Sequence, residues 1–367
     1  MIMKSLPPST NIENKLIQSA YHKNIPINGS FELTPLCNMD CEMCYVRLSP
    51  FEMHQKGRLL TVNEWLKIAE QLKESGLLFL LLSGGEPLLY PGFKELYLKL
   101  KEMGLILTIN TNATLIDDEW ASFFSYHPPR RINITLYGSN NETYRNLCHM
   151  EKGFDKALHG IQLLKEKGLP IKLASTFTKI NFKDADSIFM LADELDLPLS
   201  CDTCLMPAAR ERTSPFRFDI RLSALEAAEL RIRFLRYSMD AEHYKLYAKN
   251  KIDAIEHFIP DPNPHKVSCL AGHCSFTVNW QGNARPCVMM TSPSCSLLDH
   301  NWMEAWEYLS SEISRLSLDP KCQNCKFRPL CEICAANSYL ESGSYQTAPS
   351  YLCDYAKLSY LFLLRNL

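Results

Sequence analysis

The sequence predicts an α/β fold built on a parallel sheet. Between about residues 30 and 205, runs typical of strands alternate six times with runs typical of helices, and this alternation indicates parallel strands joined by helical crossovers. The chain has 367 residues, 46% of them hydrophobic, so it can bury a core without disulfide staples. An open doubly wound sheet and a barrel both satisfy the alternation, and in both the chemistry lies where strands end.

Caps, apolar spacing and glycines set the expected elements of this stretch. Thr61–Glu64 is a capping box, the apolar residues after it recur at helical spacing, and Gly76 ends that helix. Further helices are expected from Pro91 to Gly104 and over residues 117–125, 154–167 and 182–195. The strands are expected over residues 31–34, 77–82, 105–110, 132–137, 171–178 and 197–202. The second of these is a continuous apolar run, which is typical of a strand buried on both faces.

Composition and the start of the chain exclude several classes of protein. The net charge of −2 and the pI of about 6.6 give no basic surface for nucleic acid. No run of about 18 apolar residues exists, so no transmembrane helix is expected. Met1–Asn24 lacks the apolar core of a signal peptide. We therefore expect a cytoplasmic chain that binds neither nucleic acid nor a membrane.

The 15 cysteines are the unusual feature of the composition. A cytosolic chain cannot keep a disulfide framework, so these residues are core filler, reactive thiols or metal ligands, and their spacing decides which. Nine of them follow residue 260. The pattern is helical and charged from Arg221 to Phe258 and then becomes short, proline-rich and weakly periodic. A domain boundary is therefore expected near residue 260.

The first cysteine group, Cys37, Cys41 and Cys44, has the spacing CX3CX2C and directly follows the first expected strand. Three thiolates on one short loop can hold three corners of a cubane iron–sulfur cluster. The fourth iron is then open to a substrate or cofactor. The alternative is a zinc loop that lacks its fourth ligand, although neither His22 nor His54 lies at the usual zinc spacing.

A glycine-rich turn follows the second expected strand. Its residues are Gly84, Gly85, Glu86 and Pro87. The glycines let backbone amides approach a ligand closely, and Glu86 can accept a hydrogen bond from an ammonium group. Its position downstream of the cysteine loop, at the end of a parallel strand, favours a binding role over a simple turn.

On these residues the sequence resembles the radical S-adenosylmethionine (SAM) enzymes. CX3CX2C followed by an aromatic residue, here Tyr45, is their hallmark, and the GGE(P) element is Gly84–Pro87. The resemblance covers about residues 28–205 and implies a TIM-like partial (β/α)6 barrel. It also implies that the open iron chelates SAM and that the GGE(P) element holds the SAM amino group. One electron then cleaves SAM to methionine and a 5′-deoxyadenosyl radical, which abstracts hydrogen from an unactivated carbon.

The resemblance suggests three further SAM contacts. Thr135, at the end of the fourth strand, takes the place of a residue that touches the ribose. Arg145 is the candidate for the SAM carboxylate, and Asn112 is expected to line the pocket. The alternative for each is a polar group that is satisfied locally at a strand end.

The C-terminal cysteines resemble the SPASM extension of radical SAM proteins, with a last inner spacing of two residues instead of three. That extension usually carries two auxiliary 4Fe–4S clusters. The resemblance assigns Cys269, Cys274, Cys287 and Cys334 to the first and Cys322, Cys325, Cys331 and Cys353 to the second. The alternative is two structural zinc sites. Either metal would stabilise a segment too irregular to fold alone.

The expected domains are an N-terminal extension (1–27), a radical SAM core (28–215), a helical bridge (216–260) and a SPASM domain with a C-terminal helix (261–367). Four cysteines remain outside the metal sets. Cys201 and Cys204, at the end of the sixth strand, are either a hydrogen donor or redox pair, or buried filler. Cys148 and Cys295 receive no role.

The resemblance implies a radical SAM oxidoreductase with SAM and three 4Fe–4S clusters, acting on a peptide or protein, as in ribosomal peptide cross-linking or oxidation. It further implies an external electron donor of the flavodoxin or ferredoxin type. Only 36 residues precede Cys37, so a leader-binding module is expected as a separate protein.

Three alternatives stay open. A small-molecule radical SAM oxidoreductase is the first. A sulfatase maturase-like enzyme is the second, although those enzymes carry an Asp directly after the cysteine of the GX4C segment, where this chain has Val288. The third is a non-catalytic iron–sulfur or zinc scaffold.

Overall fold

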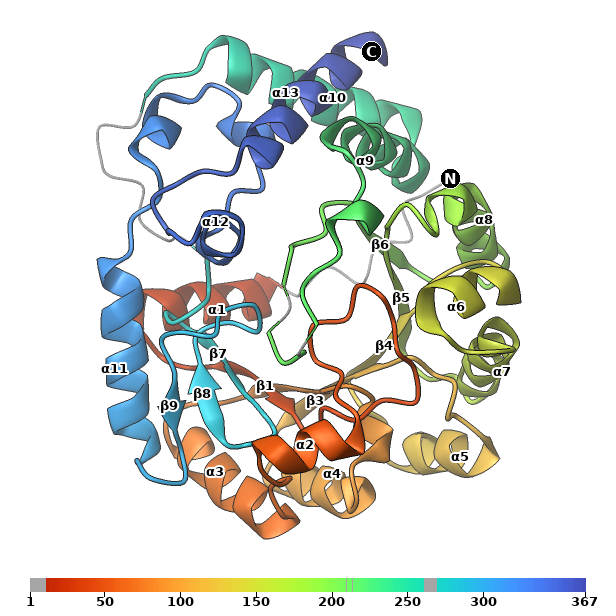
Figure 1. Cartoon of the computed structure of the whole chain (residues 1–367), viewed down its shortest axis with the longest axis vertical. Helices are drawn as coiled ribbons and strands as arrows, with labels where there is room; N and C mark the ends of the chain where they lie inside the picture. The colour runs from red at the N-terminus through yellow and green to blue at the C-terminus, as the bar shows by residue number, and fades with distance from the viewer. Residues whose placement is uncertain (1–10, 209, 213, 261–268) are drawn as a thin grey trace.

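One mixed sheet organises the fold (Figure 1). The structure is a computed structural model and describes residues 11–208, 210–212, 214–260 and 269–367. Among these residues, nine strands lie in the order β6-β5-β4-β3-β2-β1-β7-β8-β9. Their bounds are β1 (Asn28–Glu32), β2 (Phe79–Ser83), β3 (Ile106–Thr111), β4 (Arg131–Thr135), β5 (Ile171–Thr176), β6 (Leu199–Asp202), β7 (Ser275–Val278), β8 (Asn283–Arg285) and β9 (Cys295–Ser296).

The strands β1 to β6 are parallel, and each pairs with its neighbour in the sequence. A doubly wound sheet would reverse its strand order at a switch point, and this order does not reverse. The expected partial barrel is confirmed, and each predicted strand overlaps an observed one. The connecting helices are α3 (Val62–Glu74), α4 (Phe93–Glu102), α5 (Asp118–Tyr126), α7 (Gly153–Glu166) and α8 (Ala185–Glu194).

Alternation along the strands separates the core from the interior of the barrel. Ile109, Ile134 and Leu173 are fully buried and pack in the apolar core beneath the helices. Because successive strand residues point to opposite faces, their neighbours face inward. Asn133 of β4 thus donates a hydrogen bond to Asn110 of β3 across the barrel interior, with 2.8 Å between Nδ2 and Oδ1. The inner face is polar at the carboxyl ends of the strands.

Two described helices of the C-terminal region, Trp302–Arg315 and Ala335–Ser342, were not predicted, and before residue 205 three more lie where the sequence predicted none. These three are α1 (Asn11–Lys23), α2 (Pro50–Lys56) and α6 (Asn141–Cys148). The two short helices begin at caps that the sequence does contain. Ser49 forms a capping box with Glu52, and the Asn140 side chain accepts a hydrogen bond from the Thr143 amide. These caps alone did not lead to a predicted helix, because helices of seven and eight residues carry little apolar periodicity.

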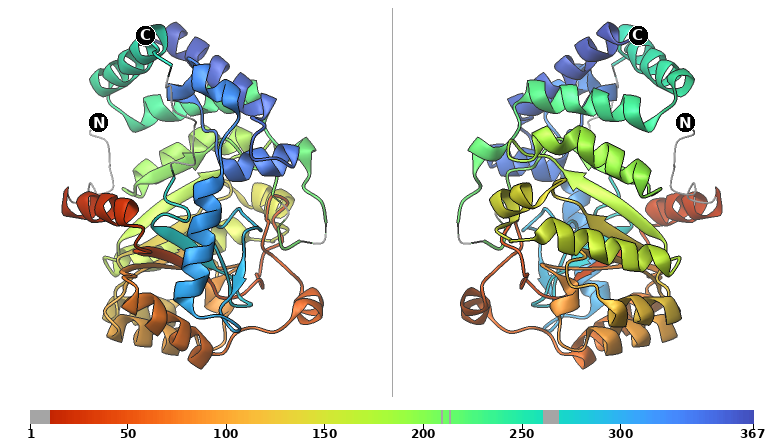
Figure 2. Two further views of the ribbon diagram at one scale, coloured as in Figure 1. Left: turned by 90° about the vertical axis from the view of Figure 1, so that its left-hand side faces the viewer. Right: turned by 90° about the vertical axis from the view of Figure 1, so that its right-hand side faces the viewer.

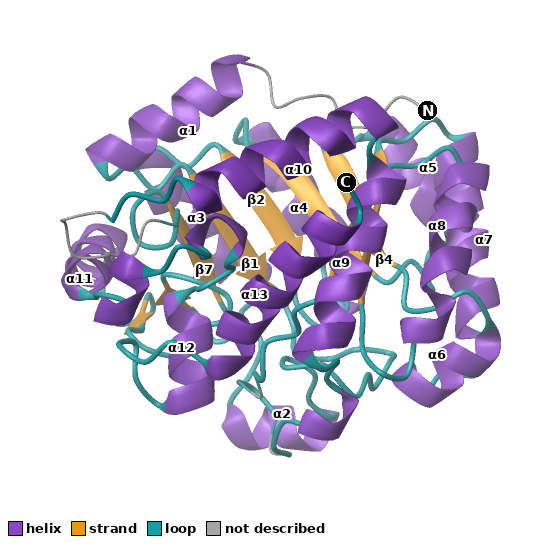
Figure 3. Ribbon diagram, turned by 90° about the horizontal axis from the view of Figure 1, so that it is seen from above, coloured by secondary structure: helices purple, strands orange, loops and turns teal. Residues whose placement is uncertain are grey.

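The cysteine-rich region continues the sheet. β7 pairs in parallel with β1, and β8 and β9 extend it with antiparallel pairing. Figure 3 shows β7 beside β1 and β2. The predicted domain boundaries remain predictions. The sheet contains hydrogen-bonded strands from both sides of the boundary expected near residue 260, since β1 pairs with β7.

The remaining helices cover one end of the molecule and one side of the sheet. α9 (Ala224–Ser238), α10 (Ala241–Glu256) and α13 (Ser350–Arg365) pack together at the top of Figure 1, and Figure 2 shows the same arrangement from both sides. α11 (Trp302–Arg315) contacts α3 and β9, and α12 (Ala335–Ser342) lies between them and α13. In the described parts of the chain, no helix has the length and apolar character that a membrane span requires.

Candidate active site

A cavity of 420 Å³ opens at the carboxyl ends of the parallel strands. Loop residues and strand-end side chains line it together, as the fold predicts. The described lining residues are Cys37, Met39, Cys41, Met43, Cys44, Tyr45, Val46, Ser83, Gly84, Gly85, Asn110, Thr111, Asn112, Thr135, Tyr137, Thr176, Asp202, Leu205, Met206 and Met289. The three cysteines of the first group and both glycines of the turn therefore share one site.

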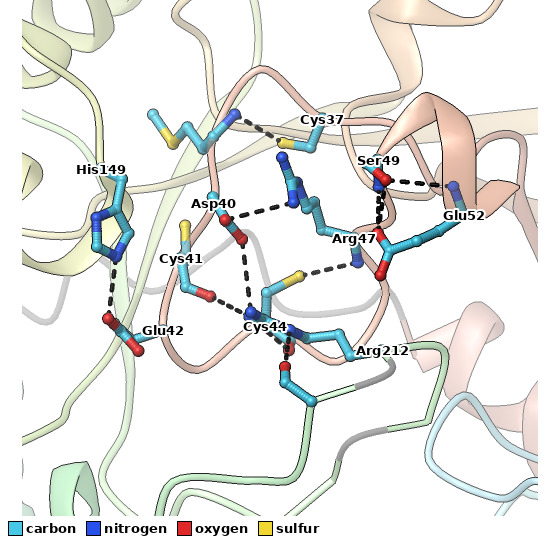
Figure 4. A network of polar contacts seen from close by, with 12 residues as sticks. Cys37, Asp40, Cys41, Glu42, Cys44, Arg47, Ser49, Glu52, His149 and Arg212 are labelled. Atoms are coloured by element: carbon cyan, nitrogen blue, oxygen red, sulfur yellow. Dashed lines mark hydrogen bonds and ion pairs between the residues drawn. The ribbon is translucent and has the colours of Figure 1, made fainter.

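Backbone amides donate to two of the three sulfur atoms of the cysteine loop (Figure 4). The Met39 amide donates to Cys37 Sγ at 3.4 Å, and the Arg47 amide donates to Cys44 Sγ at 3.3 Å. Amide donors of this kind stabilise negative charge on sulfur. The loop is tied to α6 because the Asp40 amide donates to the Cys148 carbonyl at 3.0 Å.

Without a metal, the chemistry of this loop favours neutral thiols. Burial raises the pKa of Cys37 and of Cys44, and the backbone amides offset part of that rise. For Cys41, a hydrogen bond with the Cys148 thiol and burial together raise the pKa well above its ordinary value. A bound metal would deprotonate these thiols. Three cysteines that line one cavity, with amides directed at the sulfur atoms of Cys37 and Cys44, fit a cluster held by three cysteines.

The two glycines allow the turn after β2 to lie against the segment that follows β1. The Gly85 amide donates to the Thr34 carbonyl at 2.7 Å. A Cβ atom at Gly85 would lie 2.3 Å from the Leu36 carbonyl oxygen, and one at Gly84 would lie 2.4 Å from that of Thr34. Gly84 also has a φ of 143°, which other residues rarely adopt. This close approach brings the turn to the cysteine loop.

Glu86 lies behind the cavity wall and not on it. Its carboxylate is fully buried and accepts hydrogen bonds from the Thr111 hydroxyl at 2.9 Å, the Asn112 amide at 2.9 Å and the Leu88 amide at 3.2 Å. Burial raises its pKa to about 7, and the three donors limit the rise. Glu86 therefore holds the end of β3 in place, while Gly84 and Gly85 supply the exposed part of the turn. Pro87 is also absent from the described lining.

The other predicted SAM contacts also divide into residues that line the cavity and one that does not. Tyr45, Asn112 and Thr135 line the cavity. Arg145 does not: its side chain is 52% exposed and pairs with Glu151 at 3.8 Å. Arg145 lies on α6, whose register turns Tyr144, Leu147 and Cys148 inward. The expected role of Arg145 therefore has no geometric support.

The structure also places Cys201 and Cys204 away from the cavity lining. Cys201 lies opposite Ser175 in the register of β5 and β6, whereas Asp202 lies opposite Thr176. Because side chains alternate, Asp202 and Thr176 point into the cavity and Cys201 points away. Burial raises the pKa of the Cys204 thiol to about 12, which is typical of inert core cysteine. This position corrects the expectation that the pair faces the active end.

Sequence reasoning missed several lining residues. Asn110, Thr176 and Asp202 belong to predicted strands, and the two-residue alternation of those strands could have identified them. Met206 and Met289 could not be found in that way, because they reach the cavity from irregular segments far apart in the chain. Met289 comes from the cysteine-rich region, two residues after Cys287.

The second expected auxiliary set gathers around one cavity of 370 Å³. Its lining includes Cys322, Cys325, Cys331 and Cys353 and excludes Cys334. Burial raises the pKa of Cys331 to about 11, and the charges of Cys353 and Cys322 raise it further. A cavity shared by four cysteines fits a fully ligated cluster.

Members of the first auxiliary set also influence one another. Burial raises the pKa of Cys287, with further contributions from Cys334 and Cys269. Burial raises the pKa of Cys274 to about 11, and Cys269 adds to the rise. Across the described ranges, no three His, Cys, Asp or Glu side chains are arranged to hold a single metal ion.

Comparisons with known proteins agree with this geometry. Residues 31–192 match the model of the Radical SAM superfamily. An AdoMet-dependent heme synthase of Methanosarcina barkeri is 26% identical over 345 residues, which are 90% of this chain and 97% of that protein. The sporulation killing factor maturation protein of Bacillus subtilis is 22% identical over 82% of this chain and 69% of its own. The structure of Streptococcus suis SuiB bound to precursor peptide SuiA superposes with a TM-score of 0.66 at 15% identity, covering 95% of this chain and 81% of that one.

Gly85→Ala should destabilise the protein by about 3 kcal/mol, because the added methyl group meets a backbone carbonyl that cannot move freely. Gly168→Ala is the matched control: Gly168 has a φ of 68° but no atom within 4 Å of an added Cβ, so only about 1 kcal/mol is expected. Urea unfolding of both variants measures the difference. Equal costs would contradict the close approach described above.

Glu86→Gln should change how stability depends on pH. The folded protein prefers Glu86 protonated, and this preference adds to the free energy of unfolding. The contribution is complete below the ordinary pKa of 4.5 and is lost as the pH rises through about 7. The wild type should therefore lose about 1–2 kcal/mol relative to Glu86→Gln between about pH 6 and about pH 8. Urea unfolding across that range measures the difference, and parallel curves for the two proteins would refute it.

Proposed function

Because the chain belongs to the radical SAM superfamily, we propose that it is an enzyme that uses SAM to abstract hydrogen from a peptide substrate. The observation that carries this proposal is the single cavity shared by Cys37, Cys41, Cys44 and the Gly84–Gly85 turn. A cluster-bound SAM molecule and the reacting carbon must meet in one place sheltered from water. The mouth of the barrel, lined by the loop after β1 and by the ends of β2 to β6, is such a place.

The residues of the chain have separate tasks in this proposal. Cys37, Cys41 and Cys44 would hold a 4Fe–4S cluster, which supplies, when bound, the electron that breaks the carbon–sulfur bond of SAM. The Gly84–Gly85 turn presents backbone close to the cluster loop and would bind the polar end of SAM. The hydroxyls of Thr135 and Thr176 and the amide of Asn112 can both donate and accept hydrogen bonds, which suits the ribose and the SAM carboxylate.

The lining of the cavity favours a neutral or apolar substrate group. Four methionines, Met39, Met43, Met206 and Met289, contribute to it, and methionine adapts its shape to different partners. Asp202 is the one charged side chain among the described lining residues, none of which is Lys, Arg or His. A substrate with several carboxylates would find no cation there. An amino-acid side chain within a peptide meets no such obstacle.

A small-molecule reaction remains the second candidate, and one observation favours it. The heme synthase of M. barkeri aligns with this chain over nearly its whole length. Porphyrins of that class carry carboxylate side chains, which the described lining does not match. A sulfatase maturase-like activity is less well supported, since Val288 replaces the expected Asp and it is Met289 that lines the cavity. Superfamily membership argues against the scaffold alternative.

The two auxiliary sets complete the proposal. Net removal of hydrogen from a substrate releases electrons, and two fully ligated clusters give those electrons a route outward. Met289, two residues from Cys287, lies at the cavity itself, so the first auxiliary set begins close to the substrate. An external flavodoxin- or ferredoxin-type donor and a separate leader-binding protein belong to the same proposal.

Metal content tests the ligand sets. Anaerobically reconstituted protein should bind about 12 iron and 12 sulfide, and Cys41→Ala should bind about 8 of each.

Cys41→Ala should also lose all 5′-deoxyadenosine formation, whereas Cys353→Ala should lose product but keep uncoupled SAM cleavage. Cys295→Ala removes a cysteine outside all three sets and serves as the control. Cleavage of SAM by Cys41→Ala, measured by chromatography, would refute the mechanism.

The substrate class is tested by stimulation of SAM cleavage. Precursor peptides encoded beside the gene and an iron porphyrin with carboxylate side chains are each added to the reconstituted enzyme. A peptide should raise 5′-deoxyadenosine formation and lose hydrogen, which mass spectrometry detects. Stimulation by the porphyrin and by no peptide would replace the first candidate with the second.

A further inference from the structure

Three consecutive residues after β6, Arg210, Glu211 and Arg212, contact both the cysteine loop and the segment around Cys287. We infer that this strap (residues 210–212) positions the two segments relative to each other. We further infer that Arg212 raises the reduction potential of the cluster that Cys37, Cys41 and Cys44 would hold. The inference rests on the proposed function for the presence of that cluster and on the contacts below for everything else.

Arg212 forms the end of the strap at the cysteine loop (Figure 4). Its Nη1 donates to the Cys41 carbonyl at 2.9 Å and to the Cys44 carbonyl at 3.5 Å. Its Nη2 lies 3.6 Å from an Asp40 carboxylate oxygen. One guanidinium group thus joins the backbone of two cysteines with the loop between them. The planar fork of arginine provides these donors in a fixed geometry.

Glu211 forms the middle of the strap. Its amide donates to the Tyr45 carbonyl at 2.9 Å, directly after the last cysteine of the loop. Its carboxylate accepts a hydrogen bond from Arg285 Nη1 of β8 at 3.1 Å. Glu211 and Arg285 are both buried. The middle residue therefore links the cysteine loop to a strand that ends two residues before Cys287.

Arg210 forms the other end. It donates to the Glu32 carboxylate of β1 at 2.7 Å and to the Val288 carbonyl, one residue after Cys287. Its guanidinium lies 5.2 Å from the centre of the Tyr45 ring. The Arg210 and Glu32 side chains are only 1% and 3% exposed. Breaking a buried pair of this kind is strongly unfavourable, so this end is fixed.

The strap is short, so the segments bound at its two ends cannot move far apart. Three residues span at most about 10 Å. Arg210 is bound to β1 and Val288, Glu211 to β8 and the cysteine loop, and Arg212 to the cysteine loop. A displacement of the Cys287 segment would therefore be transmitted to the carbonyls of Cys41 and Cys44. The strap fixes the geometry between a cluster that begins the reaction and a set of ligands proposed to receive its electrons.

The charge of Arg212 also acts on the cluster. The Arg212 guanidinium group donates to the carbonyls of Cys41 and Cys44, so the positive charge lies beside the backbone of two proposed cluster ligands. A positive charge in this place favours an added electron on the cluster that these cysteines would hold. The Arg212 side chain is 21% exposed, so water and salt screen it only in part.

The chain offers a matched control. Arg217 also contacts the cysteine loop, through Glu42: its Nη1 is 2.9 Å from a Glu42 carboxylate oxygen, and its side chain is 50% exposed. Glu42 and Asp219 pair with it, and solvent surrounds the group. Arg217→Gln removes the same charge from a screened position, so it should leave the cluster unchanged.

The experiment is a redox titration of the reconstituted full chain, followed by electron paramagnetic resonance. At the wild-type midpoint, Arg212→Gln should lower the ratio of reduced to oxidised SAM-binding cluster about tenfold, which corresponds to about 59 mV for a one-electron couple. Arg212→Lys should recover most of the shift, and Arg217→Gln should show none. No substrate is needed, so a failure to find a peptide that reacts would refute the proposed function and leave this result standing.

Each outcome decides the inference. A cluster in Arg212→Gln with the wild-type potential would overturn it. If Arg212→Gln fails to assemble the cluster, iron content of Arg212→Lys decides: a cluster retained with Lys supports the inference, because the loop then depends on the charge. Loss of the cluster from both variants would overturn it, because lysine keeps the charge that is held responsible.

Discussion

The structure depends on the hydrogen bonding of β1 to neighbours on both sides. β1 pairs with β2 inside the barrel and with β7 of the cysteine-rich region. Its last residue, Glu32, receives Arg210, and the chain that leaves it becomes the cysteine loop. The barrel, the cysteine loop and the C-terminal region thus share one strand. Any displacement of β1 would disturb all three, which explains why its end is held by a buried ion pair as well as by the sheet.

The sequence predicted those parts of the molecule that repeat or cluster along the chain. Six strands and their helices follow from local periodicity, and the cysteines and glycines that were singled out as motifs line one cavity. Arg145 was misplaced because α6 was not recognised, and without that helix its register could not be known. Cys201 was misplaced although β6 was predicted, because the alternation of its side chains was not applied.

Other features lay beyond any reading of local pattern. Met289 and Asp202 lie 87 positions apart in the chain and line one cavity. The strap binds residues of β1, β8 and the cysteine loop, which only the folded chain brings together. Such contacts depend on the relative placement of loops, and loops carry no periodicity that would reveal it.

The methionine lining of the cavity would add a second sensitivity to oxygen to that of the proposed metal clusters. Clusters lost in air could be rebuilt from iron and sulfide. A methionine sulfoxide persists through that procedure, because only dedicated reductases reverse it. Met39, Met43, Met206 and Met289 would then present polar, chiral groups where the cavity had been apolar and adaptable. Protein purified aerobically and refilled with iron would look complete by its spectra and still have an altered binding surface. The surface that the substrate meets would therefore depend on how the protein had been purified.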